Sequence, residues 1–439
     1  MTDGANPNSR SLRSIFTVEH NQALLKRCSH YFKKRPQQPA EPVRYDGVEA
    51  PWGARCLVQI GSVLGHVPFC RPWHPDPPPF TWFSFKALYS VTLDVLLTVV
   101  AMVELVDLLM HSGSYPVGKW IVHVWPEVVL QLAHVSLVVV TLPEAPLLAK
   151  LLRKINRLHH PSGPLASSVT FSLWVLNSLA VIVKVTLYFE YKGKGVFHSI
   201  KGFIYYLSNI YARIYMIWPL AFVMQVCLSV RSCLRSSREL VQELADTSTG
   251  EKVDCFHLED VRLWHRHLAE YNHTLVEIAS PVILIIAGEV FFSFTPHMYH
   301  YIVSSLLAGE LVQGNPLAIA ELLYMASLFG VFLALVFVIS AVVDEYNSIK
   351  LPLLEFPTYE APRLATDQLT AFNSQLFFHD PAYTALGFFV VTKTNFLKLM
   401  GVIVVYMFIL VPFHLGVHGG DNSFEHSLND TTPYFHAAM

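Results

Sequence analysis

Seven long apolar runs constrain this sequence more than any other feature. Each contains roughly 20 residues or more, enough for a helix to cross about 30 Å of hydrocarbon with every backbone hydrogen bond made internally. Only 15% of the 439 residues are charged and 53% are hydrophobic, whereas soluble proteins carry nearer one quarter charged residues. We therefore expect an all-α membrane protein with seven transmembrane helices. The runs cover residues 84–110, 119–145, 167–190, 203–230, 274–298, 316–343 and 383–414.

The distribution of Lys and Arg predicts the orientation of these helices. With most of the long N-terminal region discounted, the N-terminal side and the even-numbered connections hold 14 of these residues, against 4 on the opposite side. Because cytoplasmic loops carry the positive excess, the N-terminus is expected to be cytosolic and the C-terminus extracellular. This orientation is opposite to that of a G-protein-coupled receptor. The sequon at Asn429 then lies outside the cell, where glycosylation is possible, whereas the sequon at Asn272 would be cytosolic and unused.

The chain divides into five segments on this reading. Residues 1–83 form a cytosolic N-terminal region, with a short amphipathic helix expected from Ser14 to Tyr31. Helices 4–6 are expected to extend into the cytosol, because helical patterns continue through 231–243 and 256–275. The segments are 1–83, a six-helix transmembrane domain 84–343 with a cytosolic loop 231–273, a cytosolic anchor 344–382 with a polar helix at 365–378, a last helix 383–414 and an extracellular tail 415–439.

The last apolar run carries a recognisable pattern. Ala385 and Gly387 lie near its start and Tyr406 and Phe413 near its end, all in register with the C-terminal signature of the insect gustatory receptors, relatives of the odorant receptors. The chain resembles a divergent member of that family. Two positions depart from the signature, since Val405 stands where the family has Thr and Pro412 stands where it has Gln. Further similarities are a cytosolic helix containing Phe372, Gln375 and Leu376 and an entry segment with Leu57, Gly61, Leu64, Gly65 and Pro68.

The resemblance implies a chemosensory receptor in the plasma membrane of sensory neurons. It implies a homo- or heterotetrameric, ligand-gated, nonselective channel for monovalent and divalent cations, in which the last helix of each subunit lines one central pore. No cofactor, enzyme activity or nucleic-acid partner is expected; the net charge of −2 is unsuited to nucleic acid. At a spacing of three to four residues, one face of the last helix presents Val402, Val405, Ile409 and Pro412, which would form an apolar ring able to block ions by dewetting. An ordinary lipid-facing or core stripe has the same spacing.

An outward-facing pocket among the first six helices would take a small organic tastant. Aromatic faces with a few hydrogen-bonding groups suit such a ligand, although each residue taken alone also fits core packing or interfacial anchoring. The residues do not distinguish a sugar from a bitter compound. The ligand-binding candidates are His123, Trp125, Tyr188, Tyr206, Asn209, Tyr215, Phe291, Glu321 and Tyr324, with Glu127 and Phe292 beside them.

Ionisable side chains within the runs are costly in a membrane and usually face protein or water. Lys184 of the third run and Arg213 of the fourth are expected to pair with two of the acids of the first and fifth runs, with a direct ligand role as the alternative. The orientation of Lys393 and Lys398 in the last run is left open. The acids are Asp94, Glu104, Asp107 and Glu289.

Two other functions remain possible from the residues alone. One is a membrane protein of the same fold that conducts no ions. Pro412 favours this alternative, because proline bends a helix end and lacks the side-chain amide of the Gln that the family has at this position. The other is an intramembrane metal enzyme, suggested by His159, His160, His265 and His267. That alternative lacks the repeated histidine boxes and the matching acids that such a centre needs.

Overall fold

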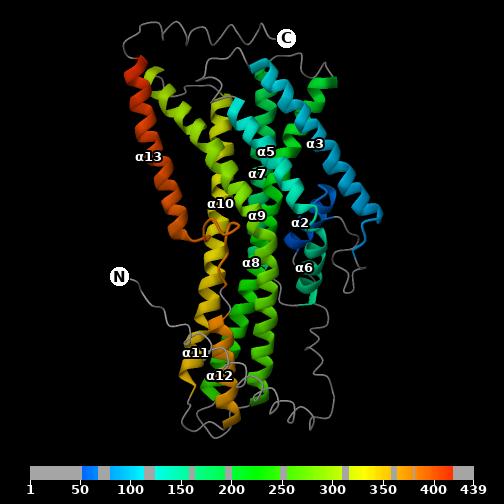
Figure 1. Ribbon diagram of the computed structural model, residues 1–439, viewed down its shortest axis with the longest axis vertical. Coiled ribbons are helices and arrows are strands. Elements are labelled where there is room, and N and C mark those ends of the chain that lie inside the picture. Colours follow the sequence, from blue (N-terminus) through cyan, green and yellow to red (C-terminus); the bar gives the residue numbers. More distant parts are fainter. Residues whose placement is uncertain are drawn as a thin grey trace, which may run out of the picture. The chain divides into compact units, whose positions relative to one another are not determined.

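A computed structural model describes nine stretches of the chain, all within the unit Glu49–Met439. Helices account for nearly all of these residues, and the described stretches contain no β-strand beyond an isolated bridge between Thr384 and Val390 (Figure 1). The prediction of an all-α protein is confirmed. The stretches are 52–67, 80–112, 124–157, 164–192, 200–247, 255–308, 316–356, 363–378 and 381–418. The predicted helix Ser14–Tyr31 and the sequon at Asn429 lie outside them.

The helices follow the apolar runs closely, and some continue well beyond them. They are α2 (Trp52–Val63), α3 (Phe85–Ser112), α5 (Trp125–Thr141), α6 (Ala145–Arg157), α7 (Pro164–Lys192), α8 (Ile200–Thr247), α9 (Cys255–Ala308), α10 (Pro316–Ser348), α11 (Lys350–Glu355), α12 (Arg363–Phe378) and α13 (Lys393–His418). Helix α8 has 48 residues and α9 has 54, which correspond to about 70–80 Å at 1.5 Å per residue. Both therefore exceed one bilayer, as the continued helical patterns predict.

Several of these helices suit a membrane by length and composition. Among the described residues, α7, α8, α9 and α10 are long and apolar enough to cross, and α5 with α6, bent by 67° at their junction, could form a fifth span. Helices α3 and α13 contain 28 and 26 residues, about 40 Å each. Helix α3 carries Asp94, Glu104 and Asp107, and the first turns of α13 carry Lys393 and Lys398.

Helix α8 forms the centre of the core. It packs against α7, α9 and α10, and also against α2, α3, α5 and α11. Its middle turns are buried on all sides, as Ile217, Leu220 and Met224 illustrate. Pro219 lies inside α8 and Pro281 and Pro296 lie inside α9, which transmembrane helices tolerate because neighbouring groups satisfy the freed carbonyls.

The start of the last helix differs from the prediction. Helix α13 begins at Lys393 rather than at 383, because residues 383–391 form a tight hairpin. Leu386 and Gly387 both have positive φ, 50° and 78°, a conformation that reverses the chain and ends any helix. The Thr392 hydroxyl then accepts a hydrogen bond from the backbone N–H of Asn395 (3.2 Å), as an N-cap does. Helix α13 also continues to His418, past the expected end at 414.

Candidate ligand-binding site

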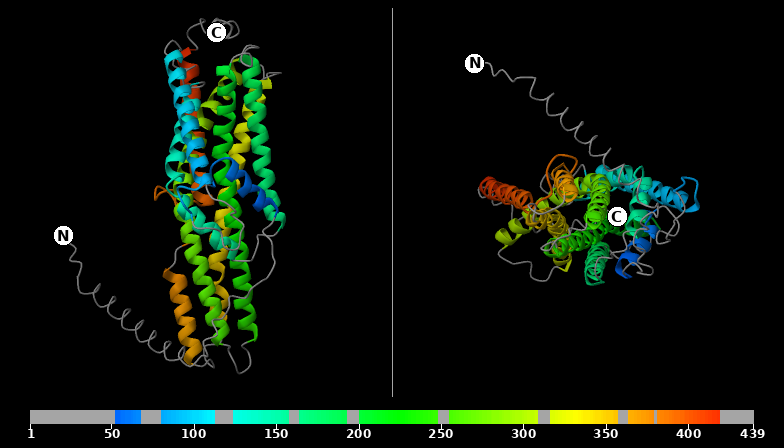
Figure 2. Two further views of the ribbon diagram at one scale, coloured as in Figure 1. Left: turned by 90° about the vertical axis from the view of Figure 1, so that its right-hand side faces the viewer. Right: turned by 90° about the horizontal axis from the view of Figure 1, so that it is seen from below.

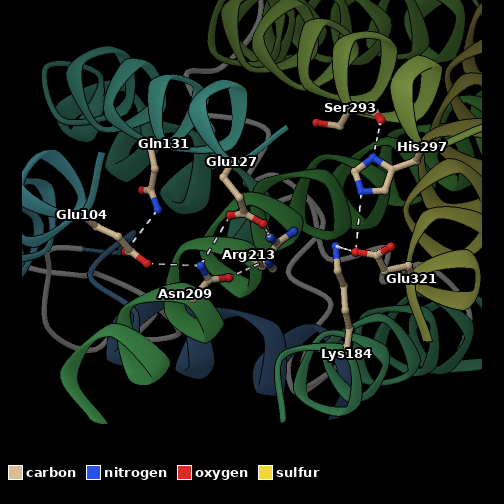
Figure 3. A network of polar contacts seen from close by, with 9 residues as sticks. All are labelled: Glu104, Glu127, Gln131, Lys184, Asn209, Arg213, Ser293, His297 and Glu321. Carbon is tan, nitrogen blue, oxygen red and sulfur yellow. Dashed lines mark hydrogen bonds and ion pairs between the residues drawn. The ribbon is translucent and has the colours of Figure 1, made fainter. Parts of the chain in front are cut away.

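A network of charged side chains is buried where α3, α5, α7, α8, α9 and α10 meet (Figure 3). Arg213 of α8 lies at its centre, with 5% of its side chain exposed. Its guanidinium donates to Glu127 Oε1 of α5 at 2.5 Å and, through Nε, to Asn209 Oδ1 at 2.8 Å. Asn209 lies one turn before Arg213 on α8, so the two side chains share a face. This arrangement lets one neutral amide orient the buried cation toward its acid.

A second ion pair lies on the other side of the network. Lys184 of α7 is 5% exposed, and its Nζ lies 3.8 Å from Glu321 Oε1 of α10. His297 Nε2 of α9 lies 3.8 Å from the same carboxylate oxygen, and its Nδ1 lies 2.7 Å from the carbonyl oxygen of Ser293. That backbone contact fixes the imidazole ring so that its other nitrogen faces Glu321.

Tyr324 joins the two ion pairs. Its ring is buried, and both cations lie over it, Lys184 Nζ at 4.7 Å and the Arg213 guanidinium carbon at 5.1 Å from the ring centroid. A desolvated cation over an aromatic face is attracted to it by up to about 2 kcal/mol. One tyrosine ring therefore fixes the spacing of α7 and α8 on the surface of α10.

The network extends to α3 through Glu104. Its carboxylate accepts from Gln131 Nε2 of α5 (3.4 Å) and from Asn209 Nδ2 (3.5 Å). Asn209 Nδ2 also lies 3.5 Å from Glu127 Oε2. Glu289 of α9 is buried within electrostatic range of Arg213 and Lys184. The site therefore couples side chains from six helices.

Within the two ion pairs, the acids are more exposed than the cations. The cations are almost fully covered, whereas the side chains of Glu127 and Glu321 are 29% and 34% exposed. A molecule entering between the helices would therefore meet carboxylate oxygens first, with the cations behind them. Such a surface binds hydroxyl or amine donors, while Tyr324 and its neighbours supply apolar contact.

The structure brings together part of the predicted ligand-binding set. Asn209, Glu321 and Tyr324 belong to the network. The expected pairing of Lys184 and Arg213 with intramembrane acids is observed, but with Glu321 and Glu127 rather than with the four acids named above. Gln131, Ser293 and His297 were missed, because their participation depends on contacts between helices far apart in the sequence.

Other predicted ligand residues lie in separate aromatic groups. The hydroxyls of Tyr206 and Thr186 share a hydrogen bond at 3.1 Å. Tyr206 and Tyr188 each pack edge-on against the ring of Phe189. Trp125 and Phe291 both pack edge-on against Phe292. Tyr215 is fully buried and stacks on His66 at 3.7 Å. His123 lies outside the described residues.

The histidines considered for a metal have other roles where the structure describes them. His265 packs against Phe372 and Tyr346, and His267 is 70% exposed. Across the described stretches, no group of three or more His, Cys, Asp or Glu side chains could hold a metal ion. His159 and His160 lie outside those stretches.

Helix α13 packs mainly against α9 and α10 and lies at the edge of the helical unit (Figure 2, right). Ile403 and Met407 face its neighbours, at 4% and 9% exposure, whereas Val402, Val405 and Ile409 are 52–63% exposed. At 100° per residue these three lie on the opposite side of the helix from the buried pair.

Tyr406 of α13 is also exposed. The side chains of Pro412 and Phe413 are outside the described set. Lys393 at the base lies 3.8 Å from Asp344 of α10.

The hairpin before α13 is fastened to the other helices. Ser280 of α9 donates to the Thr384 carbonyl oxygen (2.5 Å) and accepts from the Leu386 N–H (2.7 Å). Tyr383 donates to Asn272 Oδ1 and accepts a weak bond from the Cys227 thiol. The family-signature residue Ala385 is fully buried in this hairpin.

Comparisons with known proteins agree with this architecture. The sequence pattern of the 7tm chemosensory receptor family matches residues 54–416. The chain belongs to this family. It is therefore a multi-pass membrane protein of a receptor family, and that family is not one of enzymes. No curated protein matches the chain at a significant level.

Solved structures show the same fold. The insect olfactory receptor OR5 from Machilis hrabei superposes with a TM-score of 0.65 at 11% identity, over 81% of this chain and 97% of the receptor. The same receptor in complex with eugenol gives a TM-score of 0.63 at 10% identity, over 82% and 97%. At this identity the likeness establishes the seven-helix fold alone.

Proposed function

We propose that this family member is a gustatory receptor that acts as a ligand-gated, nonselective cation channel. A small organic tastant would bind at the charge network, and the N-terminus would be cytosolic and the C-terminus extracellular. The observation that carries the proposal is the network itself, because six helices contribute polar or charged side chains to one site, where the cations are buried and two carboxylates are partly exposed. Intramembrane charges of this kind are characteristic of functional sites. The eugenol complex of the related fold supports a small-molecule ligand.

The pore would form from α13 in four copies, identical or mixed with related receptors. Its exposed face of Val402, Val405 and Ile409 has no partner among the described residues of one subunit and suits a ring around a shared axis. Pro412 belongs to the proposed lining by its sequence position. Monovalent and divalent cations would pass when this ring widens. Ligand binding can open it only if the ligand contacts the open arrangement more favourably than the closed one.

The anchoring of the hairpin gives a route between the two sites. Helix α9 contributes His297 to the network and Ser280 and Asn272 to the hairpin that begins α13. A shift of α9 on ligand binding would therefore be transmitted to the base of the pore helix. The receptor would act in the plasma membrane of sensory neurons.

Expression in oocytes tests the proposal. A panel of sugars, bitter compounds and amino acids should evoke an inward cation current with at least one member. For that agonist, Glu321→Gln should raise the half-maximal concentration by tenfold or more, the equivalent of about 1.4 kcal/mol. Glu277→Gln is the matched control, since Glu277 is an exposed acid of α9 away from the network. Absence of any evoked current despite confirmed surface protein would favour the non-conducting alternative of the same fold.

A further inference from the structure

A row of polar side chains on α3 faces the interior of the protein. Ser90, Asp94 and Thr98 follow one another at intervals of four residues, so they share one face of the helix. Ser90 is fully buried and Asp94 is 3% exposed. Apolar residues on the other faces of α3, such as Val95 and Val99, are more than half exposed. The row therefore points into the protein, toward α5 and α8, while the rest of α3 is available to lipid.

The polar atoms of this row are not satisfied by the protein. Within the described part of the chain, Ser90 Oγ, Asp94 Oδ1 and Thr98 Oγ1 have no hydrogen-bond partner. His134 of α5 is 1% exposed, and neither of its ring nitrogens has a partner among the described residues. Each such atom costs about 1–3 kcal/mol if it remains unpaired. Buried polar atoms gathered in this way are normally satisfied by bound water or an ion.

Asp94 and His134 each lie beside Tyr215 of α8. The His134 ring packs edge-on against Tyr215 at 5.1 Å, and the Tyr215 hydroxyl faces the Asp94 carboxylate. The turn that follows α2 covers the site, since a Cβ on Gly65 would lie 3.3 Å from Asp94 Oδ1. Tyr211 and His66 complete the titratable surroundings. The site thus lies between α3, α5, α8 and the turn after α2.

The charge of Asp94 is the feature that defines the occupant. Among the described residues no Lys or Arg pairs with it, and its closest polar neighbours across the helices are the phenols of Tyr215 and Tyr211. A carboxylate inside a membrane protein needs a compensating positive charge. One carboxylate matches one monovalent cation, and carboxylate and hydroxyl oxygens are the ligands that hard cations prefer. The described stretches offer no third His, Cys, Asp or Glu side chain for a transition metal.

We propose that this cluster, formed by Ser90, Asp94, Thr98 and Tyr215, binds one partly hydrated alkali cation, Na⁺ or K⁺. The ion would satisfy Asp94 directly and the hydroxyls directly or through water. It would hold α3 and the turn after α2 against α8. Tyr215 and Arg213 are two residues apart on α8, so they point to nearly opposite sides of that helix. The cation site is therefore separate from the charge network and does not depend on the proposed tastant or on conduction.

Thermal unfolding of the purified full chain tests this proposal without an agonist. The chain is melted in NaCl, in KCl and in choline chloride at equal ionic strength, and the small cation is then titrated against choline. A ligand that binds only the folded state raises the melting temperature with concentration. We expect a saturable rise of about 3–6 °C in Na⁺ or K⁺ over choline.

Asp94→Asn should remove this dependence, and Asp107→Asn, an acid of the same helix outside the cluster, should retain it. Asp94→Asn should also melt higher than the wild type in choline, because it removes the uncompensated charge. Equal melting of the wild type in all three salts would overturn the proposal, even if the variant failed to fold. A dependence on pH without one on Na⁺ or K⁺, which would indicate a protonated Asp94, would overturn it as well.

Discussion

Replacing Arg213 by Met tests how strongly the charge network holds the transmembrane helices together. Met keeps much of the apolar volume and removes the charge, so Glu127 loses its cation and Asn209 loses its donor. Two unit charges about 4 Å apart interact by about 4 kcal/mol at an effective dielectric of 20. Removing one partner of a buried pair costs about 3–5 kcal/mol in measured cases. We expect a loss of about 4 kcal/mol and a melting temperature lower by about 4 °C.

A double-mutant cycle separates the ion pair from general packing. Arg213→Met, Glu127→Gln and the double variant are melted in detergent and followed by size-exclusion chromatography. Because the double variant buries no unpaired charge, it should be more stable than the sum of the single losses predicts, by about 2 kcal/mol or more. Arg235→Met is the matched control. Its ion pair with Glu239 is 66% and 60% exposed, so a change within about 1 kcal/mol is expected.

The reasoning is wrong if Arg213→Met melts within 2 °C of the wild type, or if the two substitutions are simply additive. Either result would mean that water or lipid headgroups already screen the Arg213–Glu127 ion pair. The network would then be solvated and would not hold the helices together.

Three further predictions concern the hairpin, the pore and the orientation. Ser280→Ala removes the two bonds that Ser280 makes to the hairpin, leaving those of Tyr383 in place, and should destabilise the protein by about 1–3 kcal/mol; Ser229→Ala, which loses only a bond to the preceding turn of α8, should cost less than half as much in the same melt, and equal effects would show that Ser280 does not anchor the hairpin. Ile409→Ser should create a basal leak current in oocytes because a polar ring no longer dewets, whereas Val404→Ser, on another exposed face of α13, should not; unchanged basal conductance at both would remove Ile409 from the pore. Asn429→Gln should abolish the mobility shift that a glycosidase produces, and a shift that persists would place glycosylation elsewhere.

Much of the fold is readable from the sequence because lipid imposes one simple requirement. A backbone in hydrocarbon must form helices, so each long apolar run became a helix near its predicted position. The extensions of α8 and α9 were also predictable, since their helical pattern continues into polar sequence. The hairpin at 383–391 was not, because its residues are as apolar as the helix that follows. Only Gly387 signals the turn, and the positive φ of Leu386 gives no sequence signal.

The candidate site was only half predictable, for a different reason. The sequence alone predicts that Arg213 and Lys184 are paired, because charged side chains inside apolar runs need partners of opposite charge. Their actual partners, Glu127 and Glu321, are fixed by the packing of α5 and α10 on α7 and α8, which no local pattern encodes. Tyr215 matched the aromatic criterion equally well, yet the structure places it against His66 and His134, on another side of α8 from the network.

The most direct test of the proposed mechanism is cysteine accessibility at the expected constriction. Ile409→Cys receptors, confirmed at the cell surface, are exposed to a charged methanethiosulfonate reagent with and without an agonist found in the oocyte panel. We predict irreversible modification of the current, faster when agonist is present, because the proposed ring of four α13 helices would then open to water. A current that the reagent leaves unchanged in both conditions would contradict a pore lined by this face of α13.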